Sequence, residues 1–254
     1  MPAARPSPLF PIIGALAALI ALLAGPATAT ESGSGRIVGS GVTKTETRAV
    51  AGFHGIGLAV DATVDLRQGG SEGLSITGDD NVVPLIETVV EDGILKIRWP
   101  RNRSGSTRYK ELVIVVDAKT IDSLAVAGSG ELNADRLTTG VLRTSLAGAG
   151  RIDIGALEAK TFSTSIDGSG NMTAAGRVES LEVSVAGSGN LFASKLESRR
   201  ARLSVAGSGT ANVWATETLN ASVAGSGDVP YVGKPQVTMS VAGSGSVKPG
   251  TPMS

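Results

Sequence analysis

The 254-residue sequence contains no cysteine, a single histidine and few aromatic residues, which make up 3% of the chain. Without cysteine there is no disulfide, zinc–thiolate site, thiol nucleophile or lipid-modified N-terminal cysteine. His54 alone cannot build a histidine metal cluster, and any Ser-His-Asp triad would have to use it. Scarce aromatics beside 34 glycines favour thin, closely stacked β layers over a bulky globular core.

Neither sign of charge dominates, since Lys and Arg together number 23 and Asp and Glu together number 23. A balanced chain carries no global field that would attract nucleic acid or an anionic membrane. We therefore expect no nucleic-acid partner. The apolar share of 41% is enough for a continuous core.

The N-terminus has the features of an export signal. Arg5 supplies a positive charge, residues 9–23 form an apolar run, and Ala27 and Ala29 place small residues where a signal peptidase cleaves. We predict that residues 1–29 are a signal peptide cleaved after Ala29, and that the mature chain is exported to the periplasm or the cell surface. An uncleaved membrane anchor is the alternative, although the apolar run is shorter than the ~20 residues that span a bilayer. No transmembrane segment is expected in the mature chain.

Composition divides the rest of the chain into four parts. Residues 30–47 are rich in Gly and Ser and are predicted to form a flexible linker. Residues 48–117 alternate apolar and polar positions and are predicted to form a β-rich capping region, in which residues 82–90 could be a short helix. Solenoid repeats are predicted over residues 118–248, and residues 249–254 are expected to be a disordered tail.

A short apolar stretch ending in Gly-x-Gly, of the form Val-Ala-Gly-Ser-Gly, recurs along the second half of the chain. Its seven copies begin at Val126, Leu146, Ile166, Val185, Val205, Val223 and Val241. The starting positions differ by 20, 20, 19, 20, 18 and 18 residues, a period typical of architectures in which each unit packs on its neighbours. The sequence therefore predicts an all-β fold, a right-handed parallel β-solenoid (β-helix) of about seven rungs of 18–20 residues.

Alternation within each repeat assigns the two faces of its strands. In the copy at Leu146, Leu142 and Thr144 precede it, and Ile152 and Ile154 follow it, on the face expected to point into the core. We expect each unit to comprise two or three short strands. The glycines belong at the corners, because glycine alone reaches positive φ and lets neighbouring turns approach closely.

Serine occupies the position before the aligned residue in six of the seven units: Ser145, Ser165, Ser184, Ser204, Ser222 and Ser240. By alternation these serines face away from the core and form a flat ladder of hydroxyl groups. The ladder is either the plain surface of an exposed, tightly spaced sheet or a binding face for polar ligands such as glycans.

A solenoid has two open ends that would recruit other chains unless they are covered. The capping region is expected to cover one end, and within it Asp92-Gly93 predicts a hairpin. Near the other end lie Pro230, Pro235, Pro249 and Pro252. These prolines are expected to blunt it, because proline cannot extend a hydrogen-bonded ladder.

Five features carry a resemblance to a known family: Phe53-His-Gly-Ile56, Thr77-Gly-Asp-Asp-Asn81, Asp92-Gly-Ile-Leu-Lys-Ile97, the Gly-Ser-Gly series, and Val229-Pro-Tyr-Val-Gly-Lys-Pro235. Together they resemble the domain family described as the putative autotransporter adhesin head, or GIN domain. The match covers most of residues 49–247. The resemblance implies an exported bacterial protein with a β-helical fold and an adhesive role.

Few residues are candidates for chemistry, and the sequence predicts no catalytic, cofactor-binding or metal site. His54 lies in a glycine-flanked turn and is expected to be structural or exposed, although it could act as a general base. Asp79 and Asp80 are expected to be solvated turn residues that face different ways. Only Asp167 and Asp228 lie in or beside the repeated glycine turns, too few for a calcium-binding roll.

Residues 98–110 carry a local cluster of basic side chains around Trp99 and Tyr109, namely Arg98, Arg101, Arg103, Arg108 and Lys110. The cluster is either a solvated loop or a patch for an anionic ligand. Binding that is insensitive to salt would argue against the patch.

The sequence thus predicts an exported, non-catalytic β-solenoid that binds a surface, glycan or protein partner at the cell envelope, with no cofactor. One alternative is an envelope polysaccharide-active enzyme with a carboxylate pair in a lateral groove. Another is a periplasmic structural or signalling partner. The sequence does not define which residues would bind a ligand.

Overall fold

A computed structural model describes residues 36–101 and 107–250 of the chain. The predicted signal peptide, Arg103 and residues 251–254 lie outside the described residues. Within the described ranges nearly all regular structure is β-strand, with one turn of 3-10 helix. No helix in these ranges has the length and apolar character needed to span a membrane.

The N-terminal half contains β1 (Ile37–Val38), β2 (Thr43–Arg48), β3 (Gly55–Ala59), β4 (Thr63–Gln68), β5 (Gly73–Asp79), the 3-10 helix η1 (Val83–Leu85), β6 (Glu87–Glu91), β7 (Ile94–Arg98), β8 (Thr107–Arg108) and β9 (Val113–Ala118). The repeats form β10 (Ser123–Gly128), β11 (Glu131–Gly148), β12 (Arg151–Gly168), β13 (Asn171–Gly187), β14 (Asn190–Gly207), β15 (Thr210–Gly225), β16 (Asp228–Val232), β17 (Gln236–Gly243) and β18 (Ser246–Pro249).

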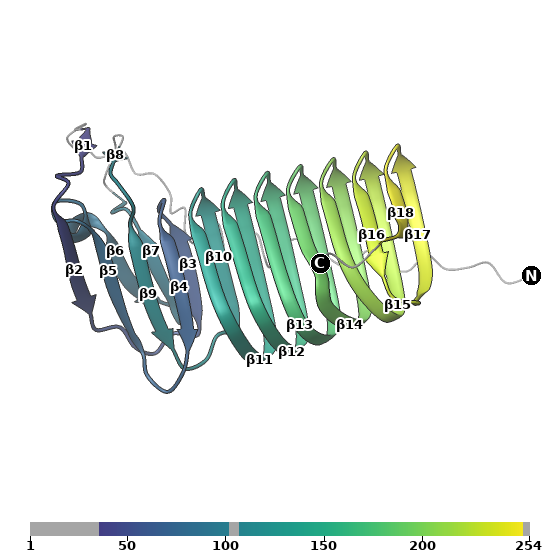
Figure 1. Cartoon of the computed structure of the whole chain (residues 1–254), viewed down its shortest axis with the longest axis horizontal. Helices are drawn as coiled ribbons and strands as arrows, with labels where there is room; N and C mark the ends of the chain where they lie inside the picture. The colour runs from purple at the N-terminus through teal and green to yellow at the C-terminus, as the bar shows by residue number, and fades with distance from the viewer. Residues whose placement is uncertain (1–35, 102–106, 251–254) are drawn as a thin grey trace, which may run out of the picture.

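The repeats build a parallel β-solenoid of about six turns, close to the seven rungs predicted (Figure 1). Strands β11 to β15 pair in parallel along nearly their whole length. Each is one continuous strand of 16 to 18 residues that bends around the coil. The expected two or three short strands per unit are therefore wrong, because each strand continues through the bends, where the register with its neighbour shifts, and ends only at the Gly-x-Gly corner.

The glycine corners stack in register along the solenoid, as predicted. The first glycine of every corner has a positive φ, between 103° and 125°. A Cβ atom on Gly187 would lie 2.5 Å from the carbonyl oxygen of Gly168 in the preceding rung. Backbone conformation and close approach therefore both require glycine at this position.

The inward-facing positions form one core that extends from the capping region through the rungs. Leu142, Thr144 and Ile152 are fully buried, and Ile154 is 1% exposed, as alternation predicted. The column that begins at Val126 remains buried up to Val223. Its last member, Val241, is instead 40% exposed, because none of the described strands stacks on β17 from that side.

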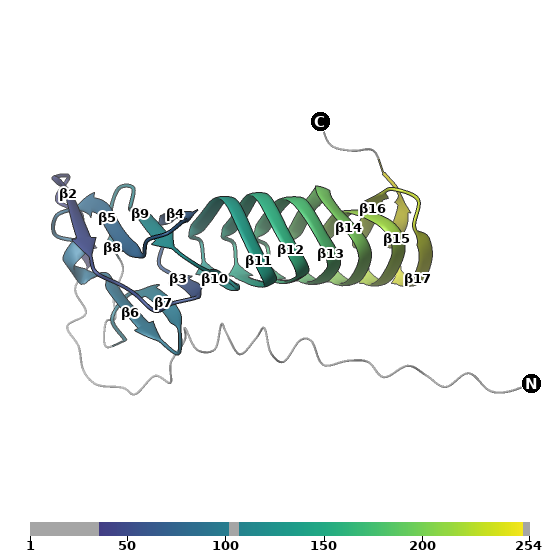
Figure 2. The ribbon, with the colours of Figure 1, turned by 90° about the horizontal axis from the view of Figure 1, so that it is seen from below.

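The capping region continues the two walls of the solenoid rather than forming a separate layer (Figures 1 and 2). On one wall β3 pairs in parallel with β10 and with β7, and β6 closes that wall as an antiparallel strand. On the other wall β4 pairs with β11 and β9, and β5 and then β2 follow as antiparallel strands. The β6–β7 pair is the hairpin that Asp92-Gly93 predicted. The parallel stack therefore ends in antiparallel strands.

Part of the predicted flexible linker is ordered, which corrects the expectation for residues 30–47. Strand β2 pairs with β5, and its last residue, Arg48, donates hydrogen bonds to the carbonyl oxygens of Val83 and Ile86. The alternation of threonine with charged residues in β2 suits a strand with one solvated face, a pattern hidden by the glycine and serine around it. The helix expected in residues 82–90 shrinks to η1, because β-branched residues favour the strand β6 that follows.

The prolines near the C-terminus blunt only one wall of the solenoid. Pro249 lies in β18, and Pro235 precedes β17, but β17 itself contains no proline. Pro230 lies in β16, which is flanked by β15 and β18 and is therefore not an edge strand. The expectation that prolines cover the whole end is therefore corrected.

Replacing Gly187 with alanine should destabilise the solenoid by about 2 kcal/mol or more, because it adds backbone strain at positive φ and a contact with the Gly168 carbonyl. The matched control is Gly140→Ala. A Cβ there meets no atom within 4 Å, and φ is not positive. Urea denaturation of both variants measures the difference, and equal midpoints would contradict the corner assignment.

Candidate binding surfaces

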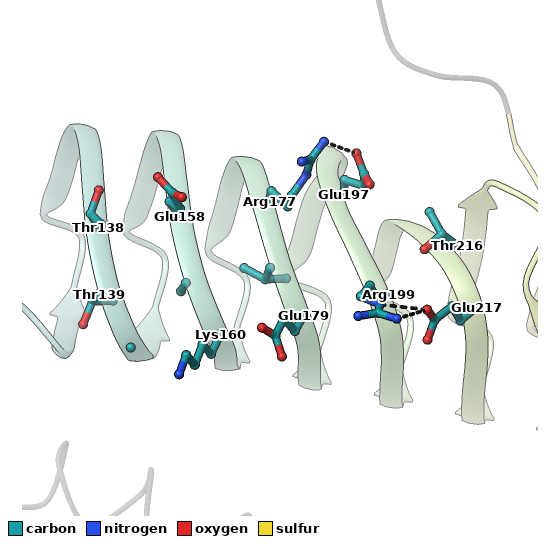
Figure 3. Close-up of a pocket in the computed structure, with 13 residues that line it drawn as sticks. Thr138, Thr139, Glu158, Lys160, Arg177, Glu179, Glu197, Arg199, Thr216 and Glu217 are labelled. Carbon is teal, nitrogen blue, oxygen red and sulfur yellow. Dashed lines mark hydrogen bonds and ion pairs between the residues drawn. The ribbon is translucent and has the colours of Figure 1, made fainter.

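A shallow groove of about 740 Å³ runs across β11 to β15 on the outside of the coil (Figure 3). It follows the bends at which the register between neighbouring rungs shifts, for example between Ile154 and Leu157. Charged side chains lie outward at these bends, whereas Val178 and Ser198 between them are buried. The lining residues are Thr138, Thr139, Gly140, Glu158, Ala159, Lys160, Arg177, Val178, Glu179, Glu197, Arg199, Thr216 and Glu217.

Charges of alternating sign line this groove in two rows. In one row Glu158, Arg177 and Glu197 are register partners on successive rungs, and Arg177 forms a 3.1 Å ion pair with Glu197. In the other row Arg199 Nη2 lies 2.6 Å from Glu217 Oε1. The hydrogen bond that Arg199 donates to the Glu217 carboxylate raises the pKa of Arg199. Exposed pairs of this kind contribute at most about 1 kcal/mol each, so the rows are not needed for stability.

The charged residues of the second row recur in the sequence at the period of the repeat. Lys160, Glu179, Arg199 and Glu217 are spaced by 19, 20 and 18 residues, within the range of spacings between the glycine corners. A charge that alternates in sign at the repeat period predicts a row of ion pairs on a parallel stack. These charged residues lie outside the glycine turns, so neither the turn pattern nor any single residue reveals this surface.

His54 lies at the edge of the capping region, where it forms a polar pair with Asp122. Its Nδ1 atom is 2.9 Å from Asp122 Oδ1, and the two side chains are 50% and 45% exposed. The backbone of His54 also bonds to Gly93 and Asp122, which joins the capping region to β10. No serine hydroxyl within the described ranges bonds to the other ring nitrogen, so the pair is not extended into a triad there.

Asp79 and Asp80 face different ways, but only Asp80 is exposed, which corrects the expectation that both are solvated. Asp79 is 5% exposed and accepts backbone hydrogen bonds from Gly41, at 2.7 Å, and from Lys110, at 3.2 Å. Asp80 accepts a hydrogen bond from the hydroxyl of Ser40. Both carboxylates therefore hold the segment before β2 against the capping region.

The acidic residues beside the glycine turns are far apart and bond to serines. Asp167 accepts from Ser165, and Asp228 accepts from Ser246. No group of three or more His, Asp or Glu side chains that could hold a metal ion occurs in residues 36–101 and 107–250.

The basic cluster predicted in residues 98–110 is divided by the fold. Arg98 is 4% exposed, whereas Arg101 and Arg108 are exposed. Trp99 and Tyr109 do meet, with ring centroids 6.0 Å apart at an interplanar angle of 61°. Arg98 is therefore a buried residue of β7 and does not belong to a solvated loop.

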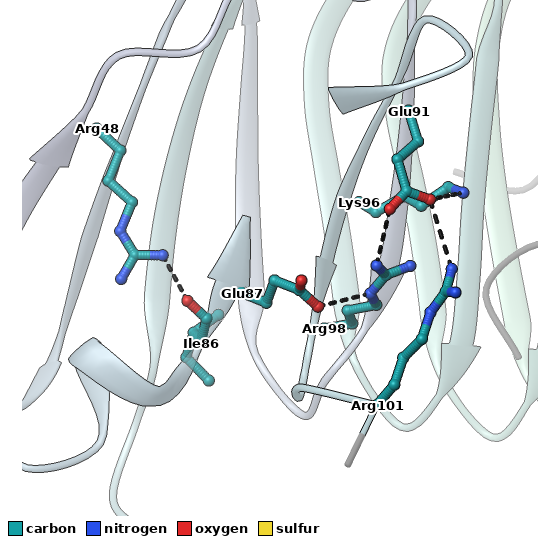
Figure 4. A network of polar contacts seen from close by, with 7 residues as sticks. All are labelled: Arg48, Ile86, Glu87, Glu91, Lys96, Arg98 and Arg101. Carbon is teal, nitrogen blue, oxygen red and sulfur yellow. Dashed lines mark hydrogen bonds and ion pairs between the residues drawn. The ribbon is translucent and has the colours of Figure 1, made fainter. Parts of the chain in front are cut away.

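Arg98 is part of a network of ion pairs on the β6–β7 hairpin (Figure 4). It donates to Glu87 at 2.9 Å and to Glu91 at 3.0 Å. Lys96, with a side chain only 2% exposed, places its ammonium 2.7 Å from Glu91. The pKa of Glu91 is lowered to about 2. The hydrogen bond from Lys96 is the largest cause, and the hydrogen bond from Arg98 is the second largest. Buried cations next to the last strand of this wall oppose its pairing with another chain.

The predicted serine ladder is in register, but it is not uniformly exposed. Its serines are paired from rung to rung between Ser145 and Ser240. Ser145 is fully buried, and its hydroxyl has no hydrogen-bond partner in the described part of the chain, whereas Ser204 and Ser222 are exposed. Ser165 and Ser184 are partly exposed, so exposure of the ladder increases toward the C-terminal end, which corrects the expectation of one flat exposed face.

These features define a repetitive β-solenoid with charged and hydroxyl rows on its outer surface, closed at one end by antiparallel strands. Residues 52–235 match the family described as "Putative auto-transporter adhesin, head GIN domain". The match spans more than half of the chain, and the chain belongs to this family. No curated protein matches the sequence.

Solved structures share this architecture. A putative adhesin from Bacteroides fragilis NCTC 9343 is 27% identical with a TM-score of 0.79, and the alignment covers 84% of this chain and 99% of that chain. A putative lipid binding protein from Parabacteroides distasonis ATCC 8503 is also 27% identical, with a TM-score of 0.73 and coverage of 85% and 100%. A putative adhesin from the same organism is 22% identical with a TM-score of 0.67, covers 84% and 99%, and shows the fold alone.

The depressed pKa of Glu91 predicts a loss of stability in acid. Its folded-state pKa is about 2 against an ordinary value of 4.5, so its contribution is complete above about pH 4.5 and disappears as pH falls toward 2. Glu91→Gln should lower stability at neutral pH, because it leaves the buried Lys96 without its carboxylate, and should reduce the further loss on acidification. Urea midpoints across this pH range measure both effects.

The control is Glu111→Gln, at an exposed carboxylate with no ion pair among those found in the described ranges. It should follow the parent chain at every pH. A Glu91→Gln chain with the same acid profile as the parent would show that the pair with Lys96 does not couple stability to pH.

Proposed function

We propose that the mature chain is an exported, non-catalytic binding module of the cell envelope, and that it binds through the groove across β11 to β15. The observation that carries the proposal is the double row of outward charges, repeated on a rigid stack and not required for the fold. The adhesin description of the family and of a 27% identical relative supports the same role.

The chemistry of the groove favours a polar polymer as the ligand, and we propose a glycan. Four glutamates face three basic residues, Lys160, Arg177 and Arg199, so the lining is close to neutral. A nearly neutral surface gives no advantage to a polyanion such as nucleic acid. Because the sign alternates from rung to rung, the same kind of contact recurs at every second rung, about every 9.6 Å, and is presented to successive segments of an extended chain.

An enzymatic role for the groove has less support. A glycosidase needs two carboxyl groups that flank the scissile bond, one of them acting as an acid. Glu197 and Glu217 are each engaged in an ion pair with an arginine, at 3.1 Å and 2.6 Å, so neither carboxylate is free to take one of these roles. The relative named as a lipid-binding protein suggests an apolar ligand, but eleven of the thirteen residues that line the groove are polar or glycine.

The double variant Lys160→Ala/Glu179→Ala should weaken glycan binding by about tenfold or more, corresponding to about 1.4 kcal/mol. Both side chains are exposed and line the groove, so the fold should be unchanged. A glycan array with the mature chain identifies the ligand, and titration of that ligand measures the loss.

The matched control is Ser204→Lys/Ser222→Lys, which places bulky charges on the exposed part of the serine ladder. It should bind like the parent chain. If this control loses binding and the groove variant does not, the serine ladder is the binding face. Turnover of the bound glycan would overturn the non-catalytic role.

A further inference from the structure

The C-terminal end of the solenoid is open on one wall. Strand β17 pairs with β15 on one side, and no other described strand pairs with its free edge. Its inward residues Val237, Met239 and Val241 are 37%, 60% and 40% exposed. Their register partners one rung earlier, in β15, are between 0% and 6% exposed. The core is therefore exposed at this end, which Figures 1 and 2 show as the end farthest from the capping region.

Strand β17 also lacks the features that normally prevent edge pairing. Its sequence, Gln-Val-Thr-Met-Ser-Val-Ala-Gly, contains no charged residue and no proline. At the other end of the same wall, buried Lys96 and Arg98 and their glutamate partners lie on β6 and β7. On the second wall, β18 carries Lys248 and Pro249. An uncharged, β-branched edge with exposed apolar residues is a template for another strand.

We propose that β17 pairs with β17 of a second copy of this chain, in antiparallel orientation about a two-fold axis. A two-fold axis normal to the wall makes the two copies of β17 run in opposite directions. The residues of β17 that face the core still face the core side of the wall in the second copy. With Met239 on the axis, Met239 lies opposite Met239 of the partner subunit, and Val237 lies opposite Val241 of the partner subunit. The apolar face of one copy then continues the core of the other. No charged residue of β17 opposes its symmetry copy.

Segments of the same chain are poorly suited to cover the free edge of β17. Residues 30–35, which remain after the predicted cleavage, reach roughly 20 Å when extended. They precede β1, which lies in the capping region. The seven inter-strand spacings from β3 to β17 already amount to roughly 34 Å, so these residues are too short to reach β17. Residues 251–254 include Pro252, which cannot extend a hydrogen-bonded ladder.

The absence of cysteine makes single-cysteine cross-linking a clean test. In either kind of antiparallel pair, residues on the axis have Cα atoms about 4.5 to 5.5 Å apart, within the range of a disulfide. The mature Met239→Cys chain should therefore form a covalent dimer under mild oxidation. Thr238→Cys should not link to itself, but should link to Ser240→Cys when the two chains are mixed, because residue 238 opposes residue 240 in this register.

Ser188→Cys is the control for random collision, since Ser188 is exposed on a central rung. Met239→Lys is the disruptive variant, because it brings two like charges together on the axis. In sedimentation of the mature chain, the parent should dimerise with rising concentration and Met239→Lys should remain monomeric with an unchanged circular dichroism spectrum.

Several results would overturn the proposal. They are a parent chain that stays monomeric at all concentrations, cross-linking of Met239→Cys no greater than that of Ser188→Cys, or self-linking of Thr238→Cys. Dimers that persist with Met239→Lys would place the interface elsewhere. If only the chain with residues 1–29 attached is monomeric, that segment covers β17 before cleavage and the proposal holds for the mature form.

Discussion

The structure depends on in-register hydrogen bonding between successive coils, and this is possible only where the backbones of two corners can approach each other. At each corner from Gly148 onward a glycine with positive φ lies almost against the glycine carbonyl of the previous rung, as at Gly187 and Gly168. A side chain there would push the coils apart and break the ladder on both walls. The glycine series therefore sets the spacing for every other feature of the molecule.

A stack of identical coils has no intrinsic end, and the two ends of this chain are treated differently. At the N-terminal end the parallel ladders change to antiparallel strands, and Lys96 and Arg98 are buried with glutamate partners on the last hairpin. At the C-terminal end β18 carries a proline, while β17 ends with its core face exposed. A two-fold pairing through β17 would leave the capping regions at the two far ends of the dimer and double the number of grooves, which favours binding to a repetitive surface.

The same stacking converts single residues into rows. A serine or a charged residue at one position of the repeat becomes a line of hydroxyl groups or of alternating charges on the outside, as with Glu158, Arg177 and Glu197. Such rows require no strained catalytic geometry and no cofactor, which suits a role in adhesion. In the proposed binding role, the surface would already be in its binding arrangement before the ligand arrives, because the hydrogen-bonded stack holds the rows in place.

The repeat period and the alternation of apolar residues determined the coil, its parallel register and its core, because both are local properties that every rung repeats. They also determined that Val205 points inward and that the glycines form the corners. The sequence could not show which outward residues remain accessible. Ser145 and Ser222 occupy the same position of the repeat, yet only Ser222 is exposed. Nor could it show that Asp79 is buried or that Val241 is left uncovered, because exposure depends on which distant segments pack on each strand and on where the stack ends, and only the tertiary structure decides both.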